Sequence, residues 1–396
     1  MSGKAKREYL RAIRGRYRRA GRREKSRILD EFCAVCGFGR KHAIRLLNRP
    51  AGRARKRPGP KPVYGQEVLR VIKTIWLAAE QMCSKRLKAA LPLWLPYYEQ
   101  RYGCLEPEIR DKVLRISPAS IDRLLRPLRA RYSGRGLSGT KPGTLLRNQI
   151  PIRTSNWDIE QPGFVEADSV AHCGNSLAGS FVWSLTFTDI YSTWTENRAV
   201  WNKGAEGVVA QVHDVESRIP FDLLGFDCDN GSEFLNHHLW RYFADRERPV
   251  AFTRSRPYHK DDNAHVEQKQ WTHVRQIFGY ERFHRPELVP LMNNLYRLEW
   301  SRLQNFFCPT MKLLHKQRIG ARYHRRHDLP KTPCQRLLES PHVSPETKQQ
   351  LRRTLETLDP FEIRNQMERK LRKIFTALRE KPTITQPVAN RADQRA

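Results

Sequence analysis

Apolar residues recur at helical spacing on both sides of a glycine-containing break near the start of the chain. The break is Gly37-Phe38-Gly39, and the residues that share one helix face are Ile28, Leu29, Phe32, Cys33 and Cys36 before it and Ala43, Leu46 and Leu47 after it. Two short helices joined by such a turn predict a helix-turn-helix within residues 24–49.

A second helical region is predicted from Tyr64 to Tyr132. Its first apolar stripe consists of Val68, Leu69, Ile72, Ile75, Trp76 and Ala79. Ser117-Pro118 is typical of an N-cap followed by proline at the first helical position. This region is either a second DNA-binding helix-turn-helix or a structural spacer. Residues 133–150, rich in Gly, Ser and Lys/Arg, are typical of a linker.

The hydrophobic period then changes from helical to strand-like. Three successive β-rich runs, 163–172, 180–190 and 194–201, predict an antiparallel meander. Helices at 204–217, 232–246 and 262–278 should alternate with strands at 221–228 and 250–253. Together these elements predict a mixed α/β layer.

After Glu281 the chain is expected to be helical or irregular and basic. A last amphipathic stripe consists of Phe361, Met367, Leu371, Ile374, Phe375 and Leu378. We interpret this stripe as docking on its own domain, with a dimer interface as the alternative.

Five segments follow from these patterns. Residues 1–62 form a basic N-terminal helix-turn-helix with an Arg/Pro-rich strap, and 63–135 form a second helical domain. Residues 136–159 are a linker, 160–285 an α/β core, and 286–396 a basic C-terminal region with an amphipathic helix.

Charge narrows the range of partners. The chain has 73 Lys+Arg against 41 Asp+Glu, a net charge of +32, which favours a polyanion such as nucleic acid. Residues 1–61 hold 21 Lys/Arg and 4 Asp/Glu, whereas 160–280 hold 11 and 17. An acidic segment inside a basic chain fits a DNA enzyme only if cations neutralise its carboxylates.

Several classes of protein are disfavoured. The eight cysteines are too dispersed for a disulfide scaffold, and no apolar run reaches the length of a membrane span, so a cytoplasmic protein is expected. Cys33 and Cys36 fit the apolar helix face better than a zinc site. The phosphate-binding motif GxxxxGK[ST] is absent, so no nucleotide cofactor is expected.

The basic side chains near the N-terminus are candidate DNA contacts. The second predicted helix carries Arg40, Lys41, Arg45 and Arg49 away from its apolar face, as a helix that enters a major groove requires. The sequence GRARKRPGPKP at 52–62 is predicted to be extended and carries Arg55, Lys56 and Arg57. It is either a minor-groove strap or a plain linker.

Carboxylates in the predicted core are candidates for metal-dependent chemistry. Asp168 lies among apolar residues of the first strand, where Glu166 shares its face, and Asp229 ends the strand at 221–228, where Asp227 shares its face. Glu267 lies on the last predicted helix of the core. Position alone does not separate these candidates.

The sequence around these residues resembles the DDE transposases of bacterial insertion sequences, in the integrase-core superfamily that includes retroviral integrases. The resemblance covers about residues 160–340 and rests on EADSVAHCG, LTFTDIYSTWTE, DCDNGSEFLN, TRSRPYHKDDNAHVEQKQWTHVR, NFFCPTMKL and KTPCQRLLE. Thirty-seven residues separate Asp229 of DNG from Glu267 of HVEQK. The order and spacing of these motifs make the resemblance specific.

The resemblance implies a ribonuclease-H-like core whose catalytic residues are Asp168, Asp229 and Glu267. These carboxylates would hold two Mg²⁺ or Mn²⁺ ions, and Glu166 and Asp227 become second choices. Other residues are given roles without metal ligation: Asp189 ends the second strand, Asn230 and Glu233 shape the turn beneath the metals, and Arg254, Arg256 and Lys269 hold phosphates or are solvated charges.

The function implied is that of a DNA transposase. It would nick the transposon ends by hydrolysis and transfer the 3′-hydroxyl directly into target DNA, as a homo-oligomer on double-stranded DNA in the bacterial cytoplasm, without a membrane or a nucleotide cofactor. Two alternatives stay open: a non-catalytic DNA-binding regulator, such as a transposition repressor or a domesticated relative, and a ribonuclease-H-like nuclease that does not join strands.

Overall fold

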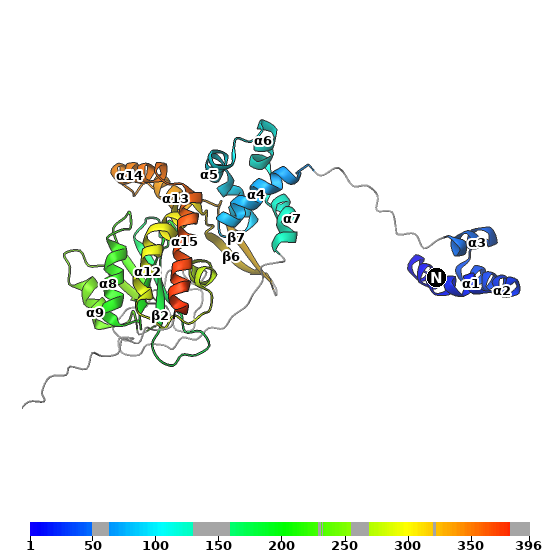
Figure 1. The fold of residues 1–396 in the computed structure, drawn as a ribbon, viewed down its shortest axis with the longest axis horizontal. Coiled ribbons are helices and arrows are strands. Elements are labelled where there is room, and N and C mark those ends of the chain that lie inside the picture. Colours follow the sequence, from blue (N-terminus) through cyan, green and yellow to red (C-terminus); the bar gives the residue numbers. More distant parts are fainter. Residues whose placement is uncertain are drawn as a thin grey trace, which may run out of the picture. The chain divides into compact units, whose positions relative to one another are not determined.

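The computed structural model describes residues 1–49, 63–129, 159–228, 231, 233–254, 269–319 and 322–380. The chain forms two compact units, Met1–Val63 and Tyr64–Ala396 (Figure 1). No helix within the described ranges is long and apolar enough to cross a lipid bilayer.

The first unit is a bundle of three helices. Helix α1 (Gly3–Arg19) packs against both α2 (Arg22–Cys36) and α3 (Arg40–Asn48). The predicted pair of helices is present as α2 and α3. Gly37 ends α2 with φ +67°, a left-handed conformation that glycine adopts without strain. The apolar face predicted from the sequence is buried, with Phe32, Ala43 and Leu47 at its centre.

The second unit contains a mixed five-stranded sheet, as the sequence predicted. Its strands are β1 (Phe164–Ala171), β2 (Val182–Asp189), β3 (Thr195–Trp201), β4 (Gly225–Cys228) and β5 (Ala251–Arg254). Their spatial order is β3-β2-β1-β4-β5, and the first three strands are antiparallel neighbours. Strands β4 and β5 run parallel to β1, and each is shorter or shifted relative to its predicted range.

One face of the sheet is covered by two short helices. They are α8 (Ala205–Glu216) and α9 (His237–Ala244), which follow β3 and β4 in the chain. The apolar core between this face and the helices includes Ala167, Leu185, Val212, Phe226 and Phe243.

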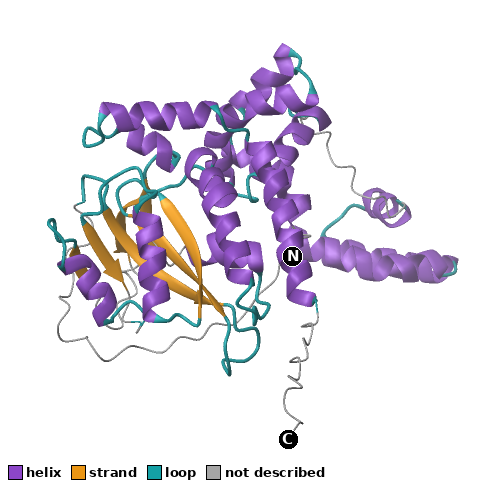
Figure 2. Cartoon of the chain, turned by 60° about the vertical axis from the view of Figure 1, so that its left-hand side comes forward, coloured by secondary structure: helices purple, strands orange, loops and turns teal. Residues whose placement is uncertain are grey.

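Helices from both ends of the unit join the apolar cluster on the other side of the sheet, where helices from the C-terminal side contact the strands directly. From the N-terminal side come α4 (Gln66–Ala78), α5 (Ser84–Tyr102), α6 (Pro107–Arg115) and α7 (Pro118–Arg129). From the C-terminal side come α12 (Leu288–Leu295), the π-helical segments η2 (Tyr296–Trp300) and η3 (Leu303–Phe307), α13 (Pro333–Glu339), α14 (Pro345–Glu356) and α15 (Pro360–Arg379). All of them contribute to one continuous apolar cluster, so the helices group beside the sheet (Figure 2).

The amphipathic stripe of α15 lies in this cluster, as the docking interpretation predicted. The ring of Phe361 lies 5.2 Å from that of Trp94 on α5, and Met367 and Ile374 are buried with it. The same Trp94 ring lies 6.1 Å from Phe307 of η3. Helices far apart in the sequence are therefore held in one core.

Two features differ from the elements expected. Residues 313–327 were expected to be helical or irregular but form a separate two-stranded hairpin of β6 (Leu313–Ile319) and β7 (Arg322–His327). The last helix of the predicted core is described only from residue 269. From there it continues through the π-helical segment η1 (Gln270–Arg275) and ends in the short helix α11 (Gln276–Phe278).

Candidate carboxylate site on the sheet

Asp168 lies in the middle of β1 and is 7% exposed. Its Oδ1 accepts a hydrogen bond of 2.7 Å from the backbone N–H of Ser169, and its Oδ2 accepts one from the amide Nε2 of Gln270. Burying a carboxylate is costly unless polar groups or cations compensate. Asp168 is therefore a buried carboxylate that polar contacts hold in place.

The sheet face that carries Asp168 is polar although it is buried. Strand pairing places Asp168 beside Thr186, and Thr186 beside Asn197 on β3. The Asn197 amide donates to Thr186 Oγ1 at 2.8 Å. Because side chains alternate along a strand, Glu166 projects from the same face. A sheet buried on both sides usually carries apolar residues on both, so this face is specialised.

The two second-choice carboxylates lie next to each other on this face. Glu166 of β1 pairs with Asp227 of β4, and they are 1% and 3% exposed. Asp227 accepts a hydrogen bond of 2.5 Å from the hydroxyl of Thr253 on β5. That contact ties Asp227 to the neighbouring strand, which suits a structural carboxylate.

A helical segment from the far end of the core contacts Asp168. Segment η1 packs against β1 and β2, and its first residue, Gln270, supplies the amide that reaches Asp168. π-helical turns occur frequently at functional sites. The sequence carried no signal that marked Gln270.

The turn after β4 is tied to β1 beside Asp168. Glu233 is 3% exposed and accepts hydrogen bonds from Ser169 Oγ and from Lys203 Nζ, the latter at 2.9 Å. Lys203 in turn lies over the ring of Trp183, 4.2 Å from its centroid. Glu233 was expected to shape this turn, whereas Ser169 and Lys203 were not singled out.

Asp229, Asn230 and Glu267 lie outside the described residues. Among the residues that are described, no group of three His, Cys, Asp or Glu side chains forms a metal-binding cluster. Glu166, Asp168 and Asp227 therefore do not form a three-ligand site by themselves. The assignment of all three catalytic carboxylates stays a prediction.

A group of basic side chains, with Lys269 buried and Arg86 and Arg336 half-buried, lies next to Gln270. Burial, reinforced by the charges of Arg86 and Arg336, lowers the pKa of Lys269 to about 7. Burial also lowers the pKa of His273 well below its ordinary value. Arg86 comes from α5, and Arg336 comes from α13, so three separate elements bring positive charge to this place.

Two further buried groups fix the ends of the sheet. Asp189 ends β2 and accepts hydrogen bonds from the N–H of Gly163 at 2.8 Å and of Ser192 at 2.6 Å, and burial raises its pKa to about 6. His172, just past β1, makes a hydrogen bond of 2.7 Å with Ser184, and burial lowers its pKa to about 3. Asp189 thus ends β2, as expected, and also caps the turn that follows it, while His172 is neutral at physiological pH.

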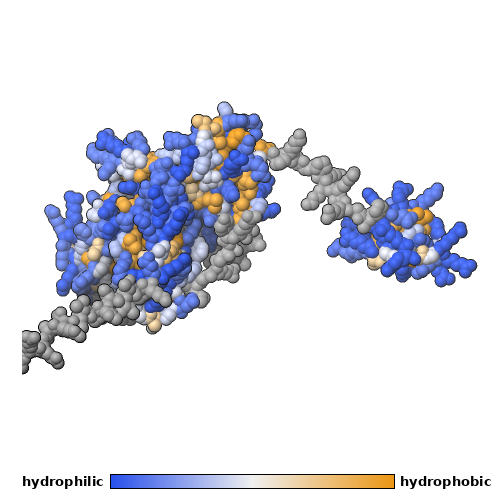
Figure 3. Space-filling view, in the orientation of Figure 1, coloured by the Kyte–Doolittle hydropathy of each residue, from blue (hydrophilic) through white to orange (hydrophobic). Residues whose placement is uncertain are grey.

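The candidate DNA contacts in the first unit lie on a largely hydrophilic surface (Figure 3). Lys41, Arg45 and Arg49 are exposed on or just after α3. The Arg40 guanidinium instead forms an ion pair with Asp30 and donates to Ser26 Oγ at 2.8 Å, so it joins α3 to α2. Exposed Ile44 and Asn48 complete the outward face of α3 but were not among the predicted contacts.

The other candidate contacts differ in their surroundings. Arg55, Lys56, Arg57 and Arg256 lie outside the described residues. Arg254 ends β5 and is 7% exposed, and Lys269 is 8% exposed. Both are buried beside the sheet rather than displayed on an open surface.

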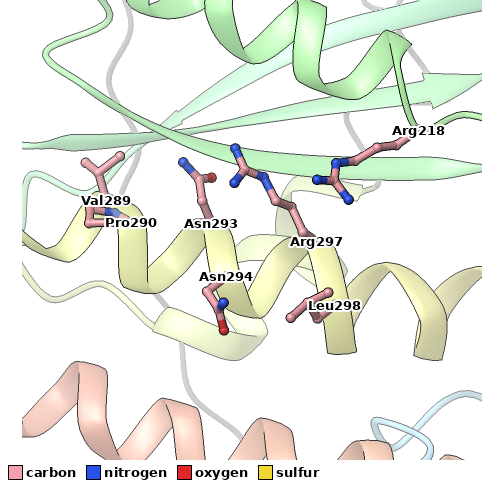
Figure 4. Close-up of a pocket in the computed structure, with 7 residues that line it drawn as sticks. All are labelled: Arg218, Val289, Pro290, Asn293, Asn294, Arg297 and Leu298. Carbon is pink, nitrogen blue, oxygen red and sulfur yellow. The ribbon is translucent and has the colours of Figure 1, made fainter.

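A surface hollow of about 450 Å³ lies on α12, away from Asp168. Arg218 and Arg297 line it, and both guanidinium groups bond Asp214, at 3.4 and 2.9 Å. In the close-up, Asn293 points toward the sheet and Asn294 points away from it (Figure 4). Because its arginines are already paired with a carboxylate, this hollow is not a strong site for an anion.

The chain is thus a mixed α/β protein with helices on both faces of a five-stranded sheet. No protein-family model matches its sequence. The uncharacterized protein y4rM of Sinorhizobium fredii is 41% identical over 334 residues, which cover 83% of this chain and 94% of that protein. The chain belongs to the same protein family as y4rM.

Two solved structures are similar to part of the chain. The catalytic core domain of BIV integrase matches with 16% identity and a TM-score of 0.27, covering 46% of this chain and 96% of that one. A chain of the simian T-cell lymphotropic virus intasome in complex with PP2A regulatory subunit B56 gamma matches with 11% identity and a TM-score of 0.24, covering 44% and 56%. These TM-scores are too low for either likeness to define a fold or a function.

Proposed function

We propose that this protein is a metal-dependent DNA transposase whose catalytic carboxylates are Asp168, Asp229 and Glu267. The observation that carries the proposal is that three segments meet around one buried carboxylate. Asp168 follows Ala167, whose partner on β4 is Cys228, and Asp168 itself accepts a hydrogen bond from Gln270 of η1.

Chain connectivity limits how far the other two carboxylates lie from this point. Asp229 directly follows Cys228, and consecutive Cα atoms are about 3.8 Å apart. Glu267 precedes Gln270 by three residues, so at most about 11 Å of chain separates their Cα atoms. Both residues are thus attached to the segments that reach Asp168, which supports their assignment to one site.

The core is proposed to be ribonuclease-H-like. An antiparallel meander of β3, β2 and β1, extended by the parallel strands β4 and β5, fits that fold. The polar face of the sheet, with Asp168 beside Thr186, is what a site for charged substrate requires and what a purely structural sheet does not.

The donor chemistry fits Mg²⁺ or Mn²⁺, because carboxylate oxygens are the ligands that these hard cations prefer. Asp168, Asp229 and Glu267 would hold the ions. Two bound cations would supply activation of the attacking oxygen and stabilisation of the leaving oxygen in phosphoryl transfer. Gln270 holds the Asp168 carboxylate in position, and Glu233 fixes the turn that follows β4 through Ser169.

The first unit is proposed to bind the transposon ends. Helix α3 follows α2 after a three-residue turn and displays Lys41 and Arg45, which fits a recognition helix in a major groove. A DNA-binding regulator without catalysis is the alternative, and it requires only this part. The motifs favour the enzyme, because they supply all three carboxylates, Asp168, Asp229 and Glu267, and only the enzyme requires all three.

The test uses the full chain with Mg²⁺, a target plasmid and a labelled duplex taken from the DNA that flanks the gene. Joined products are expected, and chelation of the metal should abolish them. Nicks without joining would indicate a nuclease, and a mobility shift without cleavage would indicate the regulator.

Three variants test the site: Asp168→Asn, Asp229→Asn and Glu267→Gln. Each should abolish cleavage while DNA binding stays within a few-fold. The matched control is Asp222→Asn, which neutralises an exposed carboxylate just before β4 and should retain activity. Full activity in any of the three variants removes that residue from the site.

A further inference from the structure

The β6–β7 hairpin is a strongly basic ribbon that the site described above does not include. Residues 313–327, LLHKQRIGARYHRRH, contain five Lys/Arg and three His and no Asp or Glu. The two strands form a sheet of their own, apart from the five-stranded sheet (Figure 1). His315, Gln317, His324 and Arg326 are exposed, as is Ile319, at 55%.

The register of the hairpin places two basic residues opposite each other, Lys316 on β6 and Arg325 on β7. Neither strand carries an acidic residue. The hairpin therefore concentrates one sign of charge, which a polyanion complements.

The root of the hairpin is fixed to the second unit. Asp328 accepts hydrogen bonds from the N–H of Lys312 at 2.6 Å and from Arg336 at 2.6 Å. Lys312 Nζ also donates to the carbonyl of Tyr191, in the turn between β2 and β3, at 2.9 Å. Arg336 is one of the cations that act on Lys269, so the ribbon starts beside the cationic group next to Gln270.

We propose that the β6–β7 hairpin is a DNA-binding arm whose cations contact the phosphates of a duplex held near the carboxylate site. A duplex presents one negative charge per roughly 1.7 Å of axis, a charge density that suits a ribbon with several cations and no acidic residue. Its major groove admits a two-stranded ribbon. Strand β6 has seven residues and is therefore about 23 Å long, enough to contact several phosphates along a duplex. The location of the duplex rests on the proposed function, whereas the affinity of the ribbon for DNA does not.

The first test measures the salt dependence of binding by the full chain to a labelled 30-base-pair duplex of mixed sequence. The variant combines Lys316→Gln, Arg318→Gln and Arg326→Gln. The control combines Arg352→Gln, Arg353→Gln and Lys373→Gln, which remove the same charge from exposed positions on α14 and α15. The slope of log K against log salt should become shallower by about 0.9 for each phosphate that the arm no longer neutralises, in the hairpin variant only. Equal slopes for the two variants would overturn the proposal.

The second test places a photo-crosslinking amino acid at exposed Gln317 or, as a control, at exposed Gln366 on α15. Crosslinks to the duplex are expected from position 317 and not from position 366. Preferential crosslinking to an RNA duplex of the same sequence, or none to DNA, would overturn the proposal. With Asp168→Asn in the same chain the crosslink should persist. Crosslinking from position 317 by a protein that never cleaves DNA would contradict the proposed function but not the DNA-binding arm. Cleavage without crosslinking would contradict the arm but not the proposed function.

Discussion

The side chains around Asp168 show how a buried carboxylate is held in one position. The Gln270 amide and the Ser169 N–H both donate to it. Hydrogen bonds to the charged form of a carboxylate favour that form and fix its rotamer. Gln270 is therefore a positioning residue, and its effect should be seen in metal dependence rather than in folding.

Replacing Gln270 by Met keeps the length of the side chain and removes the amide donor. We expect the cleavage rate to fall about 10-fold and the Mg²⁺ concentration for half-maximal rate to rise, because the carboxylate is no longer preorganised. The melting temperature should change little. Gln276→Met is the control, since its amide donates to the Glu80 carbonyl instead. Identical Mg²⁺ titrations for the two variants would contradict the role of Gln270.

Asp189 should make the stability of the protein depend on pH. Burial raises its pKa from 3.8 to about 6, so between these pH values the folded protein binds a proton that the unfolded chain does not. Its contribution is fully present below about pH 4 and is lost as pH rises through 6. The free energy of unfolding, relative to that of Asp189→Asn, should fall by up to about 3 kcal/mol from pH 4 to 7. Denaturant titrations at both pH values would test this, and parallel profiles would argue against it.

At the scale of elements, two asparagine side chains form hydrogen bonds with the outer backbone groups of the edge strand β3. The Asn293 amide accepts from the N–H of Ala199 at 2.6 Å and donates to its carbonyl at 2.9 Å. Asn305 makes the same pair of bonds with Thr195, at 2.9 and 3.0 Å. Each amide thus satisfies backbone groups that a further strand would otherwise bind.

Truncation of either side chain should therefore destabilise the fold. Asn293→Ala or Asn305→Ala leaves a buried N–H and a buried carbonyl without these partners, at a cost of roughly 2 to 4 kcal/mol. Asn294→Ala is the matched control, because Asn294 is exposed and points away from the sheet (Figure 4). Equal free energies of unfolding for the variants at 293 and 294 would refute the edge-closing role.

Helix α3 offers a contrast between two arginines five residues apart. Arg45 is exposed on the outward face, whereas the Arg40 guanidinium is paired with Asp30. Arg45→Ala should weaken binding to the flanking DNA by about 1 to 3 kcal/mol if it contacts a base edge. Arg40→Ala should have a smaller effect on binding, measured under the same salt conditions. A larger loss of DNA affinity for Arg40→Ala than for Arg45→Ala would contradict the assignment of Arg45 as the DNA contact.

At the scale of the molecule, the sequence predicted the elements whose own pattern is strong. Strands β1 to β3 are runs of apolar and β-branched residues, and their order along the chain indicated the meander. Asp168 became a candidate because a carboxylate among apolar residues is unusual, and the motif resemblance preferred it to Glu166. Asp229 and Glu267 stay predictions from the motifs.

Other features depend on contacts that no local pattern records. The run that forms β6 and β7 has no apolar face to bury, so alternation could not reveal it. Gln270 looks like any polar helix residue until η1 packs on β1. The polar face of the sheet is buried only because helices from distant parts of the chain cover it. In each case the structure depends on tertiary packing rather than on the secondary-structure propensity of the local sequence.

Helices before and after the predicted linker share one apolar core in the second unit, and this core should hold them together if the linker is cut. Helix α5 lies before the predicted linker and α15 lies after it, yet Trp94 packs against both Phe307 and Phe361. If a protease sequence is inserted between residues 136 and 150 and then cut, the two fragments should elute together in gel filtration, because separating them would expose this apolar surface to water. Trp94→Ala should promote dissociation, since removal of a buried tryptophan side chain costs about 3 to 5 kcal/mol. Fragments of the unsubstituted chain that separate without denaturant would show that the helices preceding the linker form an independent domain.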